Sequence, residues 1–399
     1  MSWEEKKLSD CCISIADGDH QAPPKADSGI PFVTISNINA NNQFDFTNTM
    51  FVPQAYYDSL DNKRKAQNGD VLYSVVGSFG IPVYIKETVP FVFQRHIAIL
   101  RPNDTILPQF LYYTMLSRDF YMMADAAALG AAQRTISLTA LRNMNISVPP
   151  MDVQEKIVGV LSAYDDLIEN NQKRIKLLEE SAQRLYKEWF VDLRFPGHET
   201  TSVVNGVPKG WKQDTISSII ELQSGFAFKS ADFCASGTYK IVTIKNVQDG
   251  LFDGQNVSRI NDIPARMPTH CRLNDGDILL SLTGNVGRVC VVNGQDYLLN
   301  QRVAKIKSDY PAYAYCLFRS SDMFTAMGNL ANGAAQQNLS PIKTGQIKVL
   351  IPPVSLLIHF EVTASAYMKQ MLNLNKQIEL LHQARDRLLP KLMSGEIEV

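Results

Sequence analysis

The clearest pattern in the chain is a long hydrophobic seam that occurs twice. In the first copy, apolar residues recur in alternating steps of four and three from Ile157 to Trp189. The second copy, from Phe360 to Leu392, keeps the same phase 203 residues later. A sustained heptad pattern is typical of long helices that pack as a coiled coil. The predicted seam positions are Ile157, Leu161, Tyr164, Ile168, Asn171, Ile175, Leu178, Leu185, Phe360, Tyr367, Met371, Leu374, Ile378, Leu381 and Leu388.

Polar residues interrupt both seams, at Asn171 in the first and at Arg385 in the second. Either position could be frayed and exposed, or a buried polar side chain there could fix the register of pairing. Two such helices in one chain most simply pair with each other, and we predict an antiparallel coiled coil. This arrangement would make the chain pseudo-two-fold symmetric, with a globular domain toward each end of the coiled coil.

The segment before each helix has a different, strand-rich pattern. Short β-prone runs such as PFVTIS and HIAILRP alternate with Gly, Pro and Asn in residues 1–150, and the same order of runs returns later. One stretch, about 107–126, has bulky apolar residues at helical spacing. We therefore predict an α+β fold class: two tandem homologous α/β domains, each with strands that form a small, irregular barrel or sheet.

Short motifs indicate that the chain is a duplication. GAAQRTIS (130–137) returns as GAAQQNLS (333–340), and NGDVLYSVVGSFG (68–80) returns as DGDILLSLTGNVG (275–287). Gln94-Arg95 returns as Gln301-Arg302 at an offset of 207. A period near 200 residues is too long for a solenoid, so each copy should be a domain. The predicted boundaries are 1–150 (first domain), 151–195 (first helix), 196–207 (irregular linker), 208–353 (second domain), 354–393 (second helix) and 394–399 (tail).

Composition narrows the class of protein. The chain has 39 Lys and Arg against 40 Asp and Glu, so any binding of nucleic acid must come from local basic faces. The six cysteines show no CxxC spacing and no His partner at metal spacing, which is typical of reduced thiols inside a cell. The N-terminal MSWEEKKLSD does not resemble a signal peptide, and no run of about 18 apolar residues occurs. We expect a soluble, cytoplasmic protein that contacts no membrane.

Motifs that carry chemistry are missing from the sequence. There is no GxGxxG after a strand, no GxxxxGK[ST] and no HExxH. The proline pairs stand in VPPM and IPPV, without the preceding Asn or Asp and the following aromatic residue of DNA amino-methyltransferases. Asp19-His20 has the residue types for acid–base work, but a solvated turn explains the pair better. We expect no catalytic residue, no metal and no cofactor bound by this chain.

Two similar domains on a rigid helical spacer suit a long polymer with two separated features, such as DNA half-sites. Base reading requires Arg, Gln, Asn or Ser on exposed loops, and Lys or Arg bind phosphate. The glycine-rich strings around Ser74 and Ser281 could contact phosphate or only bend a strand. Each candidate could also be an ordinary solvated side chain. The predicted DNA-binding residues are Lys63, Arg64, Lys65, Ser74, Gln94, Arg95, Gln133, Arg134, Lys229, Lys245, Ser281, Arg288, Gln301, Arg302, Gln336 and Gln337.

The order of these motifs resembles a known family. A domain with GDxLxSxxGxxG and QR that ends in GAAQ and Pro-Pro, followed by a heptad helix, occurs twice. This order resembles the DNA-specificity (S) subunit of type I restriction–modification systems over essentially the whole chain. The chain departs from the family pattern after the proline pairs, where Gln154-Glu155 reverses the usual Glu-Gln and the second copy has VSLLIHF.

The resemblance implies a function. Each domain would be a target-recognition domain that reads one half of a bipartite, asymmetric DNA site, and the helices would set the spacing and dock methyltransferase subunits. The implied partners are double-stranded DNA, two methyltransferase subunits that use S-adenosylmethionine, and two restriction (motor-nuclease) subunits that use ATP and Mg. The chain itself would be non-catalytic. The alternatives are a specificity subunit of another multisubunit DNA-modification system, a self-sufficient DNA methyltransferase or nuclease, and a coiled-coil adaptor that binds only proteins.

Overall fold

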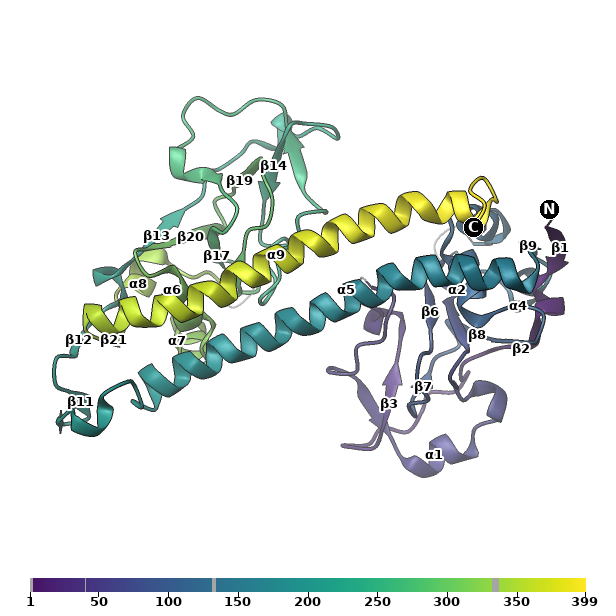
Figure 1. Ribbon diagram of the computed structural model, residues 1–399, viewed down its shortest axis with the longest axis horizontal. Coiled ribbons are helices and arrows are strands. Elements are labelled where there is room, and N and C mark those ends of the chain that lie inside the picture. Colours follow the sequence, from purple (N-terminus) through teal and green to yellow (C-terminus); the bar gives the residue numbers. More distant parts are fainter. Residues whose placement is uncertain (1–2, 40, 131–133, 332–336) are drawn as a thin grey trace. The chain divides into compact units, whose positions relative to one another are not determined.

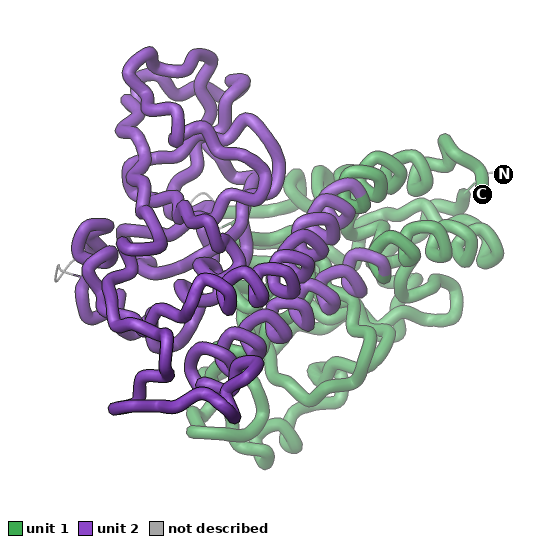
Figure 2. Tube along the Cα trace, turned by 60° about the vertical axis from the view of Figure 1, so that its left-hand side comes forward, with its two compact units in different colours: residues 1–166, 381–399 green, residues 167–380 purple. Residues whose placement is uncertain are grey.

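The computed structural model of the chain describes residues 3–39, 41–130, 134–331 and 337–399. The chain forms two compact units, residues 1–166 with 381–399 and residues 167–380 (Figure 2). Each unit holds one domain of mixed helix and sheet, which confirms the prediction of two tandem α+β domains. Two long helices, α5 (Met151–Tyr186) and α9 (Val354–Met393), contribute residues to both units. Among the helices of the described residues, none has the length and hydropathy to cross a bilayer.

The domain of the first unit is built on two sheets (Figure 1). The larger is antiparallel, with strand order β2-β8-β5-β6, and the smaller has order β4-β3-β7. A separate antiparallel ribbon pairs β1 with β9. The strand bounds are Glu4–Lys7 (β1), Cys12–Asp17 (β2), Ile30–Val33 (β3), Met50–Val52 (β4), Val71–Ser74 (β5), Pro82–Tyr84 (β6), Val92–Phe93 (β7), Ile97–Pro102 (β8) and Asn145–Val148 (β9).

The second unit repeats this topology. Its larger sheet has order β13-β20-β17-β18, its smaller sheet has order β15-β14-β19-β16, and β12 pairs with β21. The smaller sheet has one strand more than its counterpart, β16. The strand bounds are Lys212–Thr215 (β12), Ile220–Ser224 (β13), Tyr239–Val242 (β14), Ser258–Ile260 (β15), Arg272–Leu273 (β16), Ile278–Ser281 (β17), Val289–Val291 (β18), Tyr297–Leu299 (β19), Val303–Ser308 (β20) and Lys348–Ile351 (β21).

The larger sheet of each unit is covered on both faces. In β5, Val71 and Tyr73 pack in one hydrophobic cluster while Leu72 packs in another. In β17, Leu280 and Leu279 divide between two clusters in the same way. Side chains alternate between the two faces of a strand. Burial of both faces therefore explains why DVLYS and DILLS read as continuous apolar runs rather than as alternating ones.

The predicted helix at 107–126 is two helices. α2 (Pro108–Leu116) ends at Ser117, whose hydroxyl accepts a hydrogen bond from Phe120 N at 3.2 Å and caps α3 (Arg118–Ala127). Ser320 separates α6 (Pro311–Arg319) from α7 (Ser321–Leu330) in the second unit in the same way. The prediction of one helix was wrong because a serine cap ends the helical hydrogen bonding without interrupting the apolar spacing. The remaining short helices are α1 (Gln54–Ser59), α4 (Leu138–Arg142) and α8 (Pro341–Gly345).

The long helices run antiparallel within each unit. In the first unit, Asp165 of α5 pairs with Arg385 of α9, and Lys156, earlier in α5, donates to a main-chain oxygen of Val399 in the tail that follows α9. In the second unit, Asn171 bonds to Gln377, while Tyr186 packs on Phe360 with ring centroids 6.4 Å apart. Every predicted seam position is buried or half-buried.

The end of α5 differs from the prediction that the helix continues to residue 195. The α-helix ends at Tyr186, and one π-helical segment, Lys187–Val191, follows it. Leu193 then adopts a left-handed conformation with φ 57°, which no helix can continue. Phe195 precedes a proline, and a residue in that position avoids helical backbone angles.

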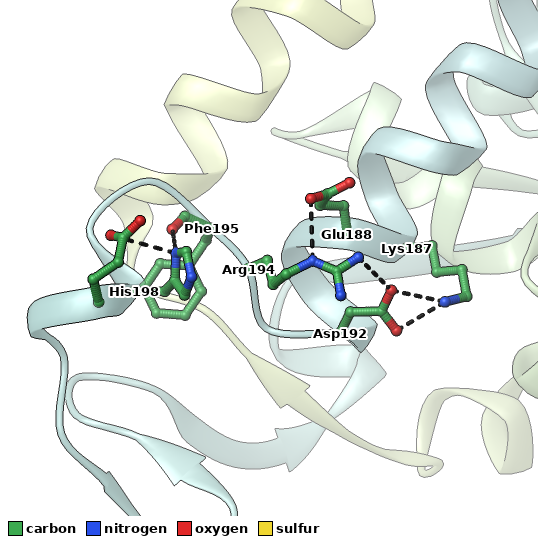
Figure 3. Close-up of polar contacts among 7 residues, drawn as sticks. Lys187, Glu188, Asp192, Arg194, Phe195 and His198 are labelled. Atoms are coloured by element: carbon green, nitrogen blue, oxygen red, sulfur yellow. Dashed lines mark hydrogen bonds and ion pairs between the residues drawn. The ribbon is translucent and has the colours of Figure 1, made fainter.

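The predicted irregular linker is an ordered connection. Arg194 bonds to Glu188 and Asp192, and Lys187 bonds to Asp192 (Figure 3). His198 lies against the carbonyl oxygen of Phe195 in the same view. The chain then makes a hairpin of β10 (Val203–Val204) and β11 (Val207–Pro208), whose two turn residues, Asn205 and Gly206, both have positive φ. The sequence VNGV signals such a hairpin, and the prediction of an irregular linker missed it.

Candidate nucleic-acid interface

The repeated SxxGxxG motif is a tight turn between two strands. In the first unit, the Ser74 hydroxyl accepts a hydrogen bond from Ile81 N at 2.9 Å, and in the second unit Ser281 accepts one from Arg288 N at 3.0 Å. The glycines of the turn have positive φ, between 72° and 93° in both units, which residues with a Cβ rarely adopt. Both serines are fully buried. Their hydroxyls shape the turn, and we leave these two residues out of the proposed DNA contacts.

The segment after GAAQ docks on this turn. Gly77 N donates to the carbonyl oxygen of Arg134 at 3.0 Å, and Gly284 N donates to that of Gln337 at 3.1 Å. Two motifs that lie more than 50 residues apart in the sequence therefore meet in each unit. The predicted contacts Gln133 and Gln336 lie outside the described residues. Gln337 is exposed, whereas Arg134 is half-buried.

A third segment, the turn before β8 and before β20, joins the same cluster. Val75 N donates to the carbonyl oxygen of His96 at 2.8 Å, and Leu282 N donates to that of Arg302 at 3.0 Å. His96 and Arg302 therefore occupy equivalent positions, at an offset of 206 residues. It follows that Arg95 is equivalent to Gln301. The sequence alignment of Gln94-Arg95 with Gln301-Arg302 was wrong by one residue, because the hydrogen-bond register is set by the strands and not by the repeated letters.

A fourth segment was missed by the sequence analysis. In the first unit, Asp19 N donates to the carbonyl oxygen of Phe93 at 3.0 Å, and Arg95 N donates to that of Asp19. The second unit repeats both bonds with Phe226 as the equivalent of Asp19. The preceding residues are Gly18 in the first unit and Gly225 in the second. A Cβ added to either glycine would overlap main-chain carbonyl oxygens of the turn before β8 or β20. Gly18 recurs as Gly225, at an offset of 207, and this repeat was the sequence signal that could have identified the segment.

We name the four segments of each unit the loop cluster. In the first unit it comprises residues 18–19, 74–81, 94–97 and 134–136. In the second unit it comprises residues 225–226, 281–288, 300–303 and 337–339. Eight segments are thus arranged in two matching sets, each at the end of the larger sheet.

Acidic residues hold one of the predicted basic side chains next to the first loop cluster. Arg64 lies 3.8 Å from Asp17 and 3.6 Å from Asp19. Asp19 also accepts a short hydrogen bond from Tyr56 and is only 8% exposed, so the expectation of a solvated turn at Asp19 was wrong. His20 is exposed and bonds to Asp17 at 2.7 Å.

The basic run of the first unit borders a hollow of about 430 Å³. Lys63 and Arg64 line it together with Arg142, which the sequence analysis did not single out. Arg142 donates to the carbonyl oxygen of Ile15 at 2.5 Å, which anchors its guanidinium at the rim. Lys65 instead lies over the Tyr57 ring, 5.2 Å from its centroid. Asp17 and Asp61 line the same hollow, so three cations stand beside two carboxylates and only a small excess of positive charge is left to attract phosphate.

The predicted polar residues of the second unit are more exposed. Lys229, Lys245, Gln301 and Arg302 all have exposed side chains. Arg288 is half-buried and donates to the side-chain oxygen of Gln248 at 2.5 Å. The two units therefore present different side chains on the same backbone framework.

Arg134 of the first unit is also held in place. Its guanidinium pairs with Asp125 and lies over the ring of Phe79, 5.5 Å from the centroid. The Phe79 ring in turn stacks on Tyr121, with 8° between the ring planes. The arginine is thus partly neutralised and faces an aromatic surface, and it also donates to the carbonyl oxygens of Asp125 and Ala128.

The described residues contain no group of three or more His, Cys, Asp or Glu side chains placed to hold a metal ion. Burial raises the pKa of the Cys12 thiol to about 12 and also raises the pKa of Cys290. Both thiols are therefore protonated near neutral pH, and a protonated thiol is a poor nucleophile and metal ligand.

Comparison with known proteins gives the family. Residues 1–180 and 208–379 match the family described as the type I restriction modification DNA specificity domain. The chain belongs to this family. The two matched segments correspond to the two copies of the duplicated sequence, each with its domain and the greater part of its long helix.

Curated relatives of this specificity family resemble the chain over much or all of its length. The MjaIX specificity subunit of Methanocaldococcus jannaschii is 25% identical over 75% of this chain and 71% of its own length. The HindI specificity subunit of Haemophilus influenzae is 22% identical over 99% of both chains. The crystal structure of a type I S subunit from M. genitalium covers 98% of this chain and 96% of its own, at 15% identity and a TM-score of 0.56. This structural likeness supports the fold.

Proposed function

We propose that the chain reads a bipartite, asymmetric DNA sequence, with one loop cluster for each half of the site. The observation that carries the proposal is the matched pair of loop clusters, in which equivalent backbone positions carry different polar side chains, of which Arg95, Gln301 and Arg302 are exposed and His96 is half-buried. Arg95 in one corresponds to Gln301 in the other, and His96 corresponds to Arg302. Equivalent frameworks with unequal side chains suit two half-sites of different sequence.

Phosphate contacts would orient each domain on the duplex. In the first unit, Lys63 and Arg142 would supply most of the positive charge beside the loop cluster, since Arg64 is paired with Asp17 and Asp19. In the second unit, Lys229 and Lys245 are the exposed cations that we propose for this role. Such contacts carry no sequence information, but they fix the register in which base-reading side chains meet the groove.

We propose that α5 and α9 form an antiparallel coiled coil that sets the number of base pairs between the half-sites. The antiparallel contacts in both units and the burial of the seam support this role. Asn171 is 5% exposed and its amide bonds to Gln377, so a sliding of the helices would leave a buried amide without its partner. A buried polar residue of this kind can fix register.

The chain would act in a complex. By the family, we propose that two methyltransferase subunits, which use S-adenosylmethionine, dock on the helices, and that two restriction subunits, which use ATP and Mg, join them. The chain itself would contribute recognition and no chemistry. A specificity subunit of another multisubunit DNA-modification system would use the same loop clusters, and the subunits encoded beside the chain would distinguish the two.

The first test is to map methylation by the chain purified with its methyltransferase subunits. We expect modification at a two-part sequence with a constant gap, and binding that weakens steeply as salt increases. Methylation without any sequence preference would contradict the proposal. Methylation by this chain alone, with labelled S-adenosylmethionine and DNA, would support the self-sufficient enzyme instead.

The second test concerns the spacer. One heptad is inserted into each helix at matched positions, after Ile168 in α5 and after Leu380 in α9, because the bonds of Asn171 to Gln377 and of Asp165 to Arg385 show which residues face each other. We expect the gap between the half-sites to change while both half-site sequences stay the same. A change of the half-site sequences at a constant gap would contradict the role of the helices.

A further inference from the structure

The tip of the turn in each loop cluster carries an exposed polar residue that has the same place in both units. Ser78 lies four residues after Ser74, and Asn285 lies four residues after Ser281. Both side chains are exposed, whereas Ser74 and Ser281 below them are fully buried. The sequence repeat does not identify either tip residue, because the position between the repeated glycines differs between the two copies.

The backbone under these tips is held from several sides. Ser281 donates its hydroxyl proton to the main-chain oxygen of Asn285 and accepts from Arg288 N, so the turn is closed by main-chain partners. The segment after GAAQ bonds to the amide of Gly284, the residue before the tip. On the other side, Phe324 of α7 lies 3.3 Å from where a Cβ on Gly287 would stand.

The first unit holds its tip through several corresponding contacts, and Ser74 accepts from Ile81 N as Ser281 accepts from Arg288 N. Gly77 N bonds to the segment after GAAQ, and the Tyr121 ring lies 2.6 Å from where a Cβ on Gly80 would stand. The framework residues are thus repeated, and the exposed residue at the summit differs. A side chain that projects from a fixed backbone loses little entropy on binding, which favours a contact that discriminates.

We propose that Asn285 and Ser78 each contact a base edge in the half-site read by their own unit. This inference rests on the proposed function and adds the tip residues to its contact set. The amide of Asn285 offers a donor and an acceptor together, which matches N6 and N7 of adenine in the major groove. The hydroxyl of Ser78 donates or accepts singly, and it fits more than one base. Asn285 therefore discriminates at one A·T pair more strongly than Ser78 does at its own position.

The test uses the chain in complex with its methyltransferase subunits and a set of duplexes in which every base pair of the wild-type site is varied singly. Asn285→Ser is expected to lower the preference for adenine at one position by about tenfold, in one half-site only. Ser78→Asn is expected to add a preference at one position in the other half-site. The gap and all other positions keep their wild-type preference. Gln295→Ser, an exposed residue at the other end of β18, is the matched control and changes no position.

Three results separate the possibilities. If wild type methylates a two-part site and Asn285→Ser leaves every preference unchanged, the tip inference fails and the proposed function stands. If Asn285→Ser and a parallel Asn285→Ala variant slow methylation equally at all sequences, the residue is structural and the inference also fails. If the wild-type complex has no sequence preference, both the proposed function and this inference are wrong.

Discussion

Arg385 of α9 donates to the Asp165 carboxylate of α5 at 2.7 Å, and Tyr113 of α2 donates to the other oxygen of the same carboxylate at 2.6 Å. The side chains of Arg385 and Asp165 are only 16% and 21% exposed. One polar network thus joins both long helices to the domain of the first unit. The equivalent positions in the second unit, Ala182 and Met368, are apolar and buried.

The first prediction follows from this network. Arg385→Ala leaves the Asp165 carboxylate half-buried without its cation, and we expect a loss of about 2 kcal/mol in the free energy of unfolding. The triple variant Asp165→Met, Arg385→Ala and Tyr113→Phe takes the Met and Ala of the second unit and removes the tyrosine hydroxyl that would lose its acceptor. It should recover most of that loss, because it leaves neither an unpaired charge nor an unpaired hydroxyl. Urea denaturation measures both variants. A triple variant no more stable than Arg385→Ala would contradict this account.

The second prediction concerns the close approach at Gly18 and Gly225. An alanine Cβ at either glycine would overlap main-chain carbonyl oxygens that cannot move independently. We expect Gly18→Ala and Gly225→Ala each to lose about 1–3 kcal/mol of stability, and each to impair recognition of one half-site. Gly159→Ala is the matched control, because a Cβ added there on the helix would have no atom within 4 Å apart from its chain neighbours and the nearby backbone of the same helix. This variant should gain up to about 1 kcal/mol. Equal effects at all three sites in thermal unfolding would rule out the steric explanation.

The third prediction is a loss of stability at alkaline pH. Burial, together with the Asp165 carboxylate, raises the pKa of Tyr112 to about 12 from an ordinary value near 10. The unfolded chain therefore releases this proton at lower pH than the folded chain, so the contribution of Tyr112 is intact below pH 10 and is lost as pH rises toward 12. The full loss is about 2–3 kcal/mol.

Denaturation at a series of pH values checks this prediction. Tyr112→Phe should make the decline between pH 10 and 12 shallower by the equivalent of about one proton. Tyr121→Phe, which alters a tyrosine that is 41% exposed, is the comparison. Identical slopes for wild type and Tyr112→Phe would show that another group controls the decline.

The fourth prediction separates the two loop clusters. Arg302→Ala should weaken recognition of one half-site, and Arg95→Ala should weaken recognition of the other, each by about 1–3 kcal/mol if the side chain meets a base edge. If the contact is to phosphate, binding should weaken by the same factor on all sequences. The slope of the logarithm of the binding constant against the logarithm of salt concentration should then become less steep by about one. Binding titrations on duplexes with one altered half-site distinguish the two. No effect of either variant would favour an adaptor that binds only proteins.

The spacing of hydrophobic residues predicted the long helices and the buried strands, because buried positions follow a regular pattern along the sequence. The seam residues of α5 and α9 and the buried strands β5 and β17 were visible in this way. Features that depend on a single hydrogen bond produce no such pattern, and the sequence did not predict them. The Ser117 cap inside an apolar run and the shift of one residue between Arg95 and Gln301 are of this kind. The repeated Gln-Arg letters suggested an equivalence that the strand register does not have.

Candidate contacts were harder to predict than the framework that carries them. Repetition pointed to Ser74 and Ser281, which are repeated because they are buried in the turn. It did not point to Ser78 and Asn285, because residues that differ between the copies leave no repeat. Arg142 was missed for a related reason, since its contact with Ile15 joins residues 127 positions apart.

The closure of the turn by main-chain partners has an evolutionary consequence. Because the hydroxyl of Ser281 bonds to backbone atoms of Asn285 and Arg288, replacing the side chain at the summit leaves those bonds in place. Substitutions of Asn285 therefore keep the hydrogen bonds that hold the turn in its folded conformation. If the two copies read separate half-sites as proposed, a single substitution at this position in one copy would change one half-site and leave the other half-site unchanged.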